Sequence, residues 1–400
     1  MRADALQGDV VIVGGGPAGL TTAIALVERV PRLRARLVVL ERDAYPREKV
    51  CAGAVSGMGE ALLAALDVRV DVPAEVMHGH AVRSPRGLSV ARPGRVARVV
   101  RREQYDAALA DVARARGVRV ETSCAVRGVG PPAADGTVAV ETARGALRAC
   151  AVVGADGVGS AVRRTIGARP GGLRAQVVEV DTEPVAGDVP RDLLHFDTSD
   201  PGLHGYAWDF ATRVDGEALV CRGVYRLLRE GERAGDGADV RDRLDARLAA
   251  IGLDPSRYRR KRFAERGFSP RDVLATERVM LVGEAAGVDP FSGEGIGPAI
   301  EYGVLAAGFL AEHLGGTLLG WTSRVRRSRL ALDLRARGAL VAPYYDGPLR
   351  AAIDGALARS PAPLEALGDL FGGRRPRLRT VARAGAASLA ALASSALARR

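Results

Sequence analysis

The sequence is poor in lysine, in aromatic residues and in paired cysteines. Of its 58 lysines and arginines only Lys49 and Lys261 are lysines, and aromatic residues make up 4% of the chain. The four cysteines lie far apart and form no CxxC pair, which argues against a structural zinc site or a redox dithiol and favours a reducing compartment. The five histidines have no spacing typical of a metal site, so we expect no bound metal.

Long apolar runs are missing as well. The longest weakly apolar stretch, residues 384–398, is shorter than the roughly 20 residues that a membrane-spanning helix needs. The sequence also lacks the succession of a charged segment, an apolar segment and a cleavage site that marks a secretory signal. We therefore expect a cytoplasmic protein that meets a membrane, if at all, only at its surface.

The net charge of +11 is unevenly distributed along the chain. Residues 1–320 hold 43 basic and 42 acidic residues, whereas residues 321–400 hold 15 arginines and five acidic residues. Such a tail suits nucleic acid, an anionic membrane surface or an anionic substrate, and a general preference for arginine explains it without any partner. Because no nucleic-acid recognition motif accompanies the arginines, we expect no specific nucleic-acid binding and favour peripheral membrane contact.

The first part of the chain alternates buried strands and helices. The apolar run 9–13 predicts a strand buried on both faces, and a glycine-rich turn, a helical pattern and a second strand at 36–41 follow it. Alternating segments after residue 171 predict an antiparallel sheet, and the apolar run 279–282 predicts a return to the first unit. We predict these regions: a discontinuous nucleotide-binding domain (1–170 and 272–320) with an insertion near 67–100, an antiparallel-sheet substrate domain (171–271), and a basic helical C-terminal region (321–400).

The turn after the first strand carries the pattern Gly14-x-Gly16-x-x-Gly19. In such a pattern the first glycine makes the tight turn, the second lets the backbone approach a pyrophosphate, and the third permits close helix packing. Glu41, at the end of the next strand, can accept hydrogen bonds from ribose hydroxyls and would repel the 2′-phosphate of NADP. The pattern therefore predicts a dinucleotide site. Its residues are Gly14, Gly16, Pro17, Ala18, Gly19, Glu41 and Arg42.

Two later segments also pair an acidic residue with glycine after a strand, which a nicotinamide site alone would not need. They are Asp156-Gly157 and the segment 283–297. The three segments together resemble the FAD-binding signature of the para-hydroxybenzoate-hydroxylase-like flavoproteins, which include the geranylgeranyl reductases. The resemblance implies FAD as the cofactor, with Asp156 and Gly157 near its pyrophosphate and the third segment near its ribityl chain and ring. In the third segment it assigns Gly283, Glu284 (in place of the usual aspartate), Pro290, Gly293, Gly295, Ile296 and Gly297.

Arg102 and Cys51 each have two interpretations. The resemblance assigns Arg102 to the cofactor, and the alternative is a surface arginine at a helix N-terminus. Cys51 lies in a loop similar to the lysine/proline-x-cysteine-x-glycine loop of geranylgeranyl reductases, in which the cysteine sits near flavin and substrate. The alternative is a small buried apolar residue.

Three of the scarce aromatic residues are spaced two apart, at Tyr206, Trp208 and Phe210. This segment is similar to an aromatic cavity motif of the geranylgeranyl reductases, with Ala211 in place of its proline. Residues two apart on a strand share one face of the sheet, so the rings line one surface. That surface is either an apolar lid over the flavin or a core patch against the helix predicted at 239–251.

The resemblance implies an α/β fold: a Rossmann-like FAD-binding domain of three-layer ββα type, an inserted antiparallel-sheet substrate domain and a helical tail. It implies an FAD-dependent oxidoreductase, foremost one that reduces double bonds of an isoprenoid or similar apolar substrate through Cys51, Tyr206, Trp208 and Phe210. An FAD-dependent monooxygenase acting on a small apolar or aromatic substrate is the main alternative, and a basic non-catalytic nucleic-acid binder is a third. A halogenase is disfavoured because the sequence has no Trp-x-Trp-x-x-Ile-Pro segment. No second dinucleotide lobe is evident, so NAD(P)H would bind transiently or a ferredoxin-like protein would supply the electrons; the oligomeric state is not indicated.

Overall fold

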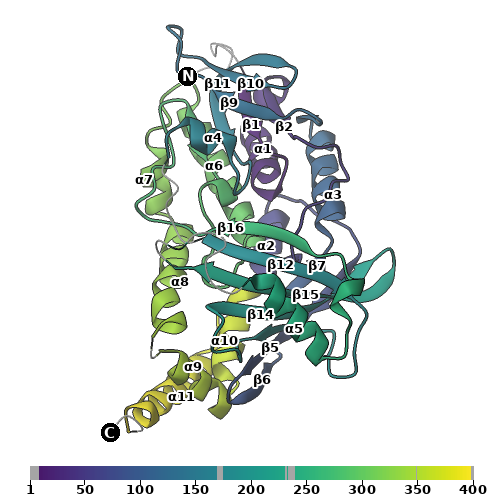
Figure 1. Ribbon diagram of the computed structural model, residues 1–400. Coiled ribbons are helices and arrows are strands. Elements are labelled where there is room, and N and C mark those ends of the chain that lie inside the picture. Colours follow the sequence, from purple (N-terminus) through teal and green to yellow (C-terminus); the bar gives the residue numbers. More distant parts are fainter. Residues whose placement is uncertain (1–8, 169–173, 230–231, 233–238, 348, 398–400) are drawn as a thin grey trace.

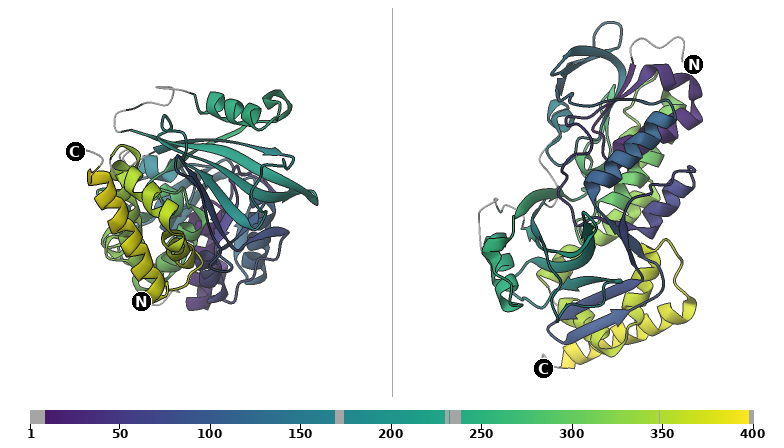
Figure 2. Two further views of the ribbon diagram at one scale, coloured as in Figure 1. Left: turned by 90° about the horizontal axis from the view of Figure 1, so that it is seen from below. Right: turned by 90° about the vertical axis from the view of Figure 1, so that its right-hand side faces the viewer.

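The computed structural model describes residues 9–168, 174–229, 232, 239–347 and 349–397 of the chain. Two sheets follow one another along the long axis of the molecule, the first in the upper part of Figure 1 and the second in the lower part. The C-terminal helices run down one side from the first part to the second, and Figure 2 shows the same arrangement from two other sides.

The first sheet is seven-stranded and mostly parallel. Its strands are β1 (Asp9–Val13), β2 (Leu37–Leu40), β8 (Arg119–Glu121), β9 (Val126–Val129), β10 (Val138–Thr142), β11 (Gly145–Gly154) and β17 (Val279–Leu281). Their order is β8-β2-β1-β11-β10-β9, with β17 paired to β11, and only β9 and β10 run antiparallel to their neighbours. The apolar side chains of β1 and β2 are buried, as the continuous apolar runs predict.

Helices α1 (Pro17–Arg29), α3 (Arg102–Ala115) and α6 (Ile296–His313) lie side by side against this sheet (Figure 1). The contact between α1 and α6 is close because Gly303 has no side chain: a Cβ there would stand 2.7 Å from the Cβ of Thr21. Shorter helical elements complete this part: η2 (Pro31–Arg36), α2 (Gly57–Ala64), α4 (Ala161–Thr165) and η4 (Gly283–Ala285).

The second sheet is also seven-stranded. Its strands are β5 (Gly79–Ser84), β6 (Gly87–Ala91), β12 (Arg174–Thr182), β13 (Leu193–Asp197), β14 (Gly205–Val214), β15 (Glu217–Leu228) and β16 (Lys261–Arg266), in the order β16-β12-β15-β14-β13-β5-β6. Helix α5 (Val240–Ala250) covers one face, where its Leu244 and Leu248 pack in one cluster with Val178, Ala207 and Val224. The side chains that alternate with these point to the other face. A short η3 (Pro255–Arg257) follows α5.

The second sheet is assembled from two separate stretches of chain. Strands β5 and β6 come from the segment that the sequence analysis treats as an insertion, and β5 pairs in parallel with β13. A small sheet of β3 (Ala54–Ser56), β7 (Ala97–Val100) and β4 (Ala74–Met77) leads into this pair of strands. The predicted α/β fold class is confirmed, whereas the domain boundary predicted at residue 170 lies outside the described residues.

The C-terminal region is helical, as predicted. Its helices are α7 (Trp321–Arg326), α8 (Arg329–Tyr345), α9 (Leu349–Arg359), α10 (Ala362–Phe371) and α11 (Leu378–Leu397). Helices α9 and α10 contact β5 and β6, so the tail packs on the second sheet. Among the described residues, no helix combines the length and the apolar character that crossing a membrane requires.

Candidate functional site

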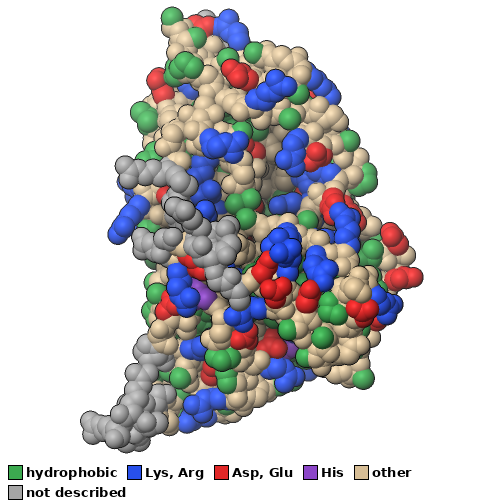
Figure 3. Space-filling view, in the orientation of Figure 1, with side chains coloured by type: hydrophobic (Ala, Val, Ile, Leu, Met, Phe, Trp, Pro, Cys, Tyr) green, Lys and Arg blue, Asp and Glu red, His purple; other side chains and the backbone are tan. Residues whose placement is uncertain are grey.

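A cavity of about 440 Å³ lies between the two sheets. Its walls come from the ends of the first sheet's strands, from the face of the second sheet opposite α5, and from the tail through Phe371. Figure 3 shows the surface hollowed between the two parts of the molecule, with Lys and Arg side chains around the hollow. The volume is in the range of ligand pockets.

The glycines of the first motif have distinct structural roles. Gly14 has φ of +106°, and a Cβ there would lie 2.3 Å from the carbonyl oxygen of Ala155. A Cβ on Gly19 would lie 2.0 Å from the carbonyl oxygen of Gly14, so both positions require glycine for the fold itself. Gly16 differs, because a Cβ there would meet only the Nη2 atom of Arg102, at 4.0 Å. The space in front of Gly16 belongs to the cavity.

Helix α1 begins at this space, and among the described residues no side chain caps its first turn. Its first N–H groups therefore face the cavity together with the partial positive charge of a helix N-terminus. This arrangement fits the diphosphate of a dinucleotide. Pro17 and Ala18 of this turn also line the cavity.

The buried carboxylate of Glu41 is held in place at the end of β2. Its Oε2 accepts the N–H of Gly15 at 2.9 Å and lies 3.2 Å from Nη2 of Arg47, and its Oε1 accepts the N–H of Asp43 at 3.1 Å. A carboxylate oxygen accepts more than one hydrogen bond, so a ribose hydroxyl can bind here too. The exposed Arg42 pairs with Asp43 at the rim of the cavity.

Arg102 is buried rather than on the surface, which excludes the alternative interpretation from the sequence. Its guanidinium makes two hydrogen bonds to the carboxylate of Asp106, at 2.8 and 2.9 Å. Asp106 in turn lies 3.1 Å from Arg47. This pairing fixes Arg102 opposite Gly16, where it can contact a bound diphosphate.

In the second motif, the side chain of Asp156 holds a turn of the backbone at the cavity wall. The carboxylate of Asp156 accepts hydrogen bonds from Oγ of Ser160 at 2.5 Å and from the N–H groups of Ala161 and Val162, at the start of α4. Asp156 thus fixes the turn and leaves Gly157, with φ of +76°, at the cavity wall.

The third motif brings a second helix N-terminus to the cavity. Helix α6 starts after Gly295, and within the described part of the chain no side chain caps it. A Cβ on Gly297 would lie 2.5 Å from Oε1 of Glu294, and one on Gly283 would lie 2.7 Å from the Cβ of Ala18. Gly293 has φ of +69°. Of the other residues assigned to this motif, Ile296 lines the cavity and Pro290 is buried next to it.

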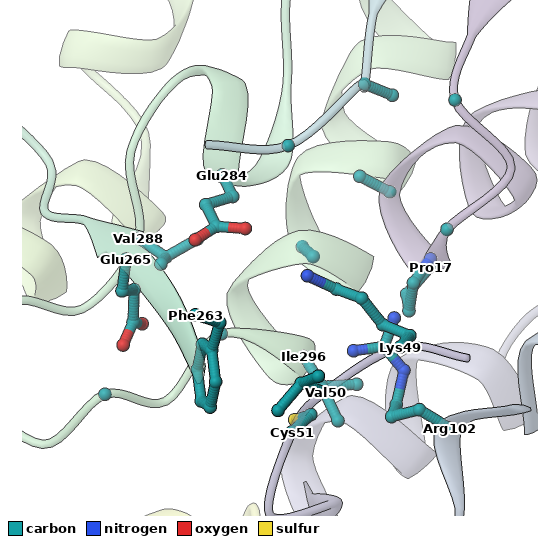
Figure 4. Close-up of a pocket in the computed structure, with 18 of the residues that line it drawn as sticks. Pro17, Lys49, Val50, Cys51, Arg102, Phe263, Glu265, Glu284, Val288 and Ile296 are labelled. Carbon is teal, nitrogen blue, oxygen red and sulfur yellow. The ribbon is translucent and has the colours of Figure 1, made fainter. Parts of the chain in front are cut away.

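Glu284 lies close to the second motif, since its Oε2 would be 3.7 Å from a Cβ on Gly157. Figure 4 shows its carboxyl group directed into the cavity. Burial raises the pKa of this carboxyl, and Lys49 and Arg102 act in the opposite direction. Lys49 extends into the cavity in the same view, and the sequence analysis did not assign it to the site.

The aromatic residues Tyr206, Trp208 and Phe210 line the cavity, on the face of β14 that points away from α5. The core patch against α5 is thereby excluded. Tyr206 stacks on Tyr225 with ring centroids 5.0 Å apart, and Phe196 packs edge-on against Phe210 at 5.3 Å. The wall is larger than the motif alone predicts.

Cys51 lines the cavity close to Lys49. Its Sγ accepts the N–H of Gly53 at 3.4 Å. Burial raises the pKa of the thiol, while Arg102 lowers it and the carboxylate of Glu179 raises it further. The thiol is therefore protonated at neutral pH.

The site also contains residues that the sequence analysis missed. Glu265 faces the cavity from β16, and Phe371 reaches it from α10. Arg337 of α8 lies behind the third motif, with Nη1 2.9 Å from Oδ2 of Asp289 and 2.7 Å from Oε2 of Glu294. The side chain of Asp289 also accepts the N–H of Phe291 at 2.7 Å, so this ion-pair cluster holds the loop before α6.

Several solved structures share this fold. A geranylgeranyl bacteriochlorophyll reductase-like protein from Thermoplasma acidophilum is 21% identical, with 94% of this chain and 95% of that chain covered and a TM-score of 0.64. A flavoprotein/dehydrogenase from Cytophaga hutchinsonii is 17% identical, with 92% of each chain covered and a TM-score of 0.69. A flavin-dependent brominase is 16% identical, with 95% and 98% covered and a TM-score of 0.69. At such identities the similarity shows the fold and leaves the reaction open.

No curated protein matches the chain. Residues 7–321 match the model of a protein family described as FAD binding domain. The two uncapped helix N-termini, the open space at Gly16 and the fixed carboxylate of Glu41 fit the cofactor that this description names. Because the match covers most of the sequence, the chain belongs to the FAD binding domain family of flavoproteins.

Proposed function

We propose that the protein is an FAD-dependent reductase that saturates carbon–carbon double bonds of an isoprenoid or a similar apolar substrate. The observation that carries the proposal is the continuous aromatic wall directly beside the loops that fit the cofactor. An apolar substrate gains free energy from burial against such a wall, at about 25 cal/mol for each Å² of apolar surface removed from water.

When bound and reduced, FAD supplies a hydride to one carbon of the double bond. The faces of Tyr206, Trp208 and Phe210 stabilise the positive charge that develops on this same carbon as the other carbon is protonated. These rings also exclude water from the cavity, and Cys51, which lines the same cavity, contacts the substrate. The external reductant is NAD(P)H or a ferredoxin-like protein, and anaerobic mixing with each shows which one removes the yellow colour of oxidised FAD.

The proposed reaction is tested by the mass of the product. Reduced enzyme without oxygen is expected to add two hydrogen atoms per double bond to a polyprenyl diphosphate or a polyprenyl alcohol. A substrate that gains one oxygen atom in air, with no saturated product under any condition, would show that the chain is a monooxygenase instead. If no polyprenyl compound gives either product, the proposed isoprenoid substrate class is wrong.

We further propose that α11 binds an anionic membrane surface, from which an apolar substrate reaches the cavity. Leu378, Val381, Leu389 and Leu392 on its outer face are 88%, 50%, 69% and 48% exposed. Exposed arginines accompany them at the N-terminal end of the helix, namely Arg375, Arg377, Arg379 and Arg383. Leucines together with arginines on one exposed helix are typical of helices that lie in a membrane interface.

In the full chain, replacing Leu389 and Leu392 by glutamate is expected to lower binding to vesicles with anionic lipids at least about tenfold, because apolar burial is lost and repulsion is added. Co-sedimentation measures the binding. The matched control replaces Leu332 and Leu340 of α8, which are 67% and 39% exposed. Equal binding by both variants, or binding of DNA in preference to vesicles, contradicts the membrane role.

A further inference from the structure

Glu265 is a carboxyl group inside the aromatic half of the cavity. It lies on β16, and strand alternation places it on the same face as Phe263; Figure 4 shows both side chains directed inward. The residue is 7% exposed. Its carboxyl group stands beside the loop before α6, since a Cβ on Gly293 would be 3.2 Å from Oε2 and one on Gly295 would be 3.8 Å from Oε1.

Among the residues that the structure describes, none makes a hydrogen bond or an ion pair with the Glu265 side chain. Burial raises the pKa of this carboxyl well above its ordinary value. The negative charges of Glu284 and Asp289, on the two loops that face it, act in the same direction, and Lys49 acts against them. Burial without a counter-charge favours the protonated, uncharged form of this side chain, and its carboxyl group lines the cavity.

The other O–H groups of this wall are already engaged. The hydroxyl of Tyr206 donates to the carbonyl oxygen of Ser292 at 2.5 Å, and that of Tyr225 donates to the carbonyl oxygen of Pro290 at 3.3 Å. The thiol of Cys51 is an intrinsically weaker acid than a carboxylic acid, and burial weakens it further. Glu265 thus combines the position, the protonation state and the acidity that a proton donor needs.

We propose that Glu265 is the acid that donates the proton in the reduction of the double bond. The inference rests on the proposed function. The hydride forms a C–H bond at one carbon, the O–H bond of Glu265 breaks, and its proton forms a C–H bond at the other carbon. The carboxylate left behind takes a proton from water, so the substrate gains one hydride and one proton and the acid is regenerated.

The experiment compares Glu265→Gln with the control Asp354→Asn in the holoenzyme. Asp354 is another buried acid whose pKa burial raises, and it lies on α9, outside the residues that line the cavity. In Glu265→Gln we expect unchanged FAD binding and unchanged reduction of the flavin by dithionite, but reoxidation by saturating substrate at least about 100-fold slower. The control variant stays within threefold of wild type. Glu265→Asp keeps the acid at a shorter reach and is expected to lie between the two.

A second measurement does not depend on turnover. Isotope-labelled glutamate identifies the infrared carbonyl band of a protonated carboxylic acid, and the difference between wild type and Glu265→Gln at neutral pH isolates the band of residue 265. Its presence is expected. An ionised carboxylate at that position, or a Glu265→Gln variant that oxidises as fast as wild type while Cys51→Ser does not, overturns the proposal. If wild type saturates no double bond, the proposed function fails, and the infrared band alone decides whether residue 265 is an acid.

Discussion

A chain with Gly16→Val is expected to fold as the wild type does and to bind FAD at least about 100-fold less tightly, a loss of about 2.7 kcal/mol. Gly16 has φ of −90° and ψ of −176°, an extended conformation that valine adopts readily. Apart from Arg102 nothing stands within 4 Å of the new Cβ, so the protein itself is not strained. The valine side chain instead occupies the space that leads to the first N–H groups of α1.

The measurement is flavin titration of the cofactor-free chain, together with its thermal unfolding without FAD. Gly19→Ala is the contrasting variant, because its Cβ would lie 2.0 Å from a carbonyl oxygen of the turn. We expect Gly19→Ala to lower the stability of the cofactor-free chain, and Gly16→Val to leave it unchanged. Wild-type FAD affinity in Gly16→Val would show that the diphosphate does not bind at this turn.

These two glycines also show what a sequence pattern can predict. The spacing of Gly14, Gly16 and Gly19 encodes local backbone geometry, since Gly19 packs on the carbonyl oxygen of Gly14 within the turn itself. The contact between Gly14 and the distant Ala155 does not follow from that spacing. The face of the second sheet on which Trp208 lies does not follow from a local pattern in this way. Strand alternation shows that it shares a face with Tyr206, but which face α5 covers depends on how the sheet packs.

Apart from Lys49, which lies two residues before Cys51, the site residues that the sequence analysis missed come from distant parts of the chain. Strands β5 and β6 join the second sheet through parallel pairing with β13, more than 100 residues later, and no local pattern encodes that pairing. Phe371 lies 74 residues beyond Gly297, the last residue of the third motif, and still lines the same cavity. One local feature of the sequence could have identified Glu265 as a site residue. It is an acidic residue on the strand face that also carries Phe263.

One arginine of the basic tail has a role inside the protein. The charge pattern predicts a surface for anions, whereas Arg337 is directed inward, at Asp289 and Glu294. Both carboxylates are almost fully inaccessible to solvent. One helix of the tail therefore supplies the positive charge that allows two acids to be buried behind the third motif.

Arg337→Met is expected to lower the free energy of unfolding by about 3 to 5 kcal/mol at pH 8, because it leaves two buried carboxylates without a counter-charge. Chemical denaturation of the holoenzyme measures the loss, and FAD is expected to dissociate more readily because the loop before α6 is released. The control is Arg324→Met. That residue pairs with Glu312 in an exposed ion pair, which contributes at most about 1 kcal/mol.

The loss depends on pH in a direction that the structure fixes. Burial raises the pKa of Glu294, and Arg337 lowers it, so removing Arg337 raises that pKa further above its value in the unfolded chain. A carboxyl group with a raised pKa in the folded state destabilises the fold as pH rises from the unfolded pKa through the folded one. The loss of unfolding free energy in Arg337→Met relative to wild type is therefore expected to be small near pH 5 and to reach its full size by pH 8.

Adding Glu294→Gln to Arg337→Met removes one of the two unpaired charges. The double variant should therefore recover part of the lost free energy at pH 8 and little of it at pH 5. A deficit that is equal at both pH values would mean that Arg337 stabilises the loop by packing rather than by charge.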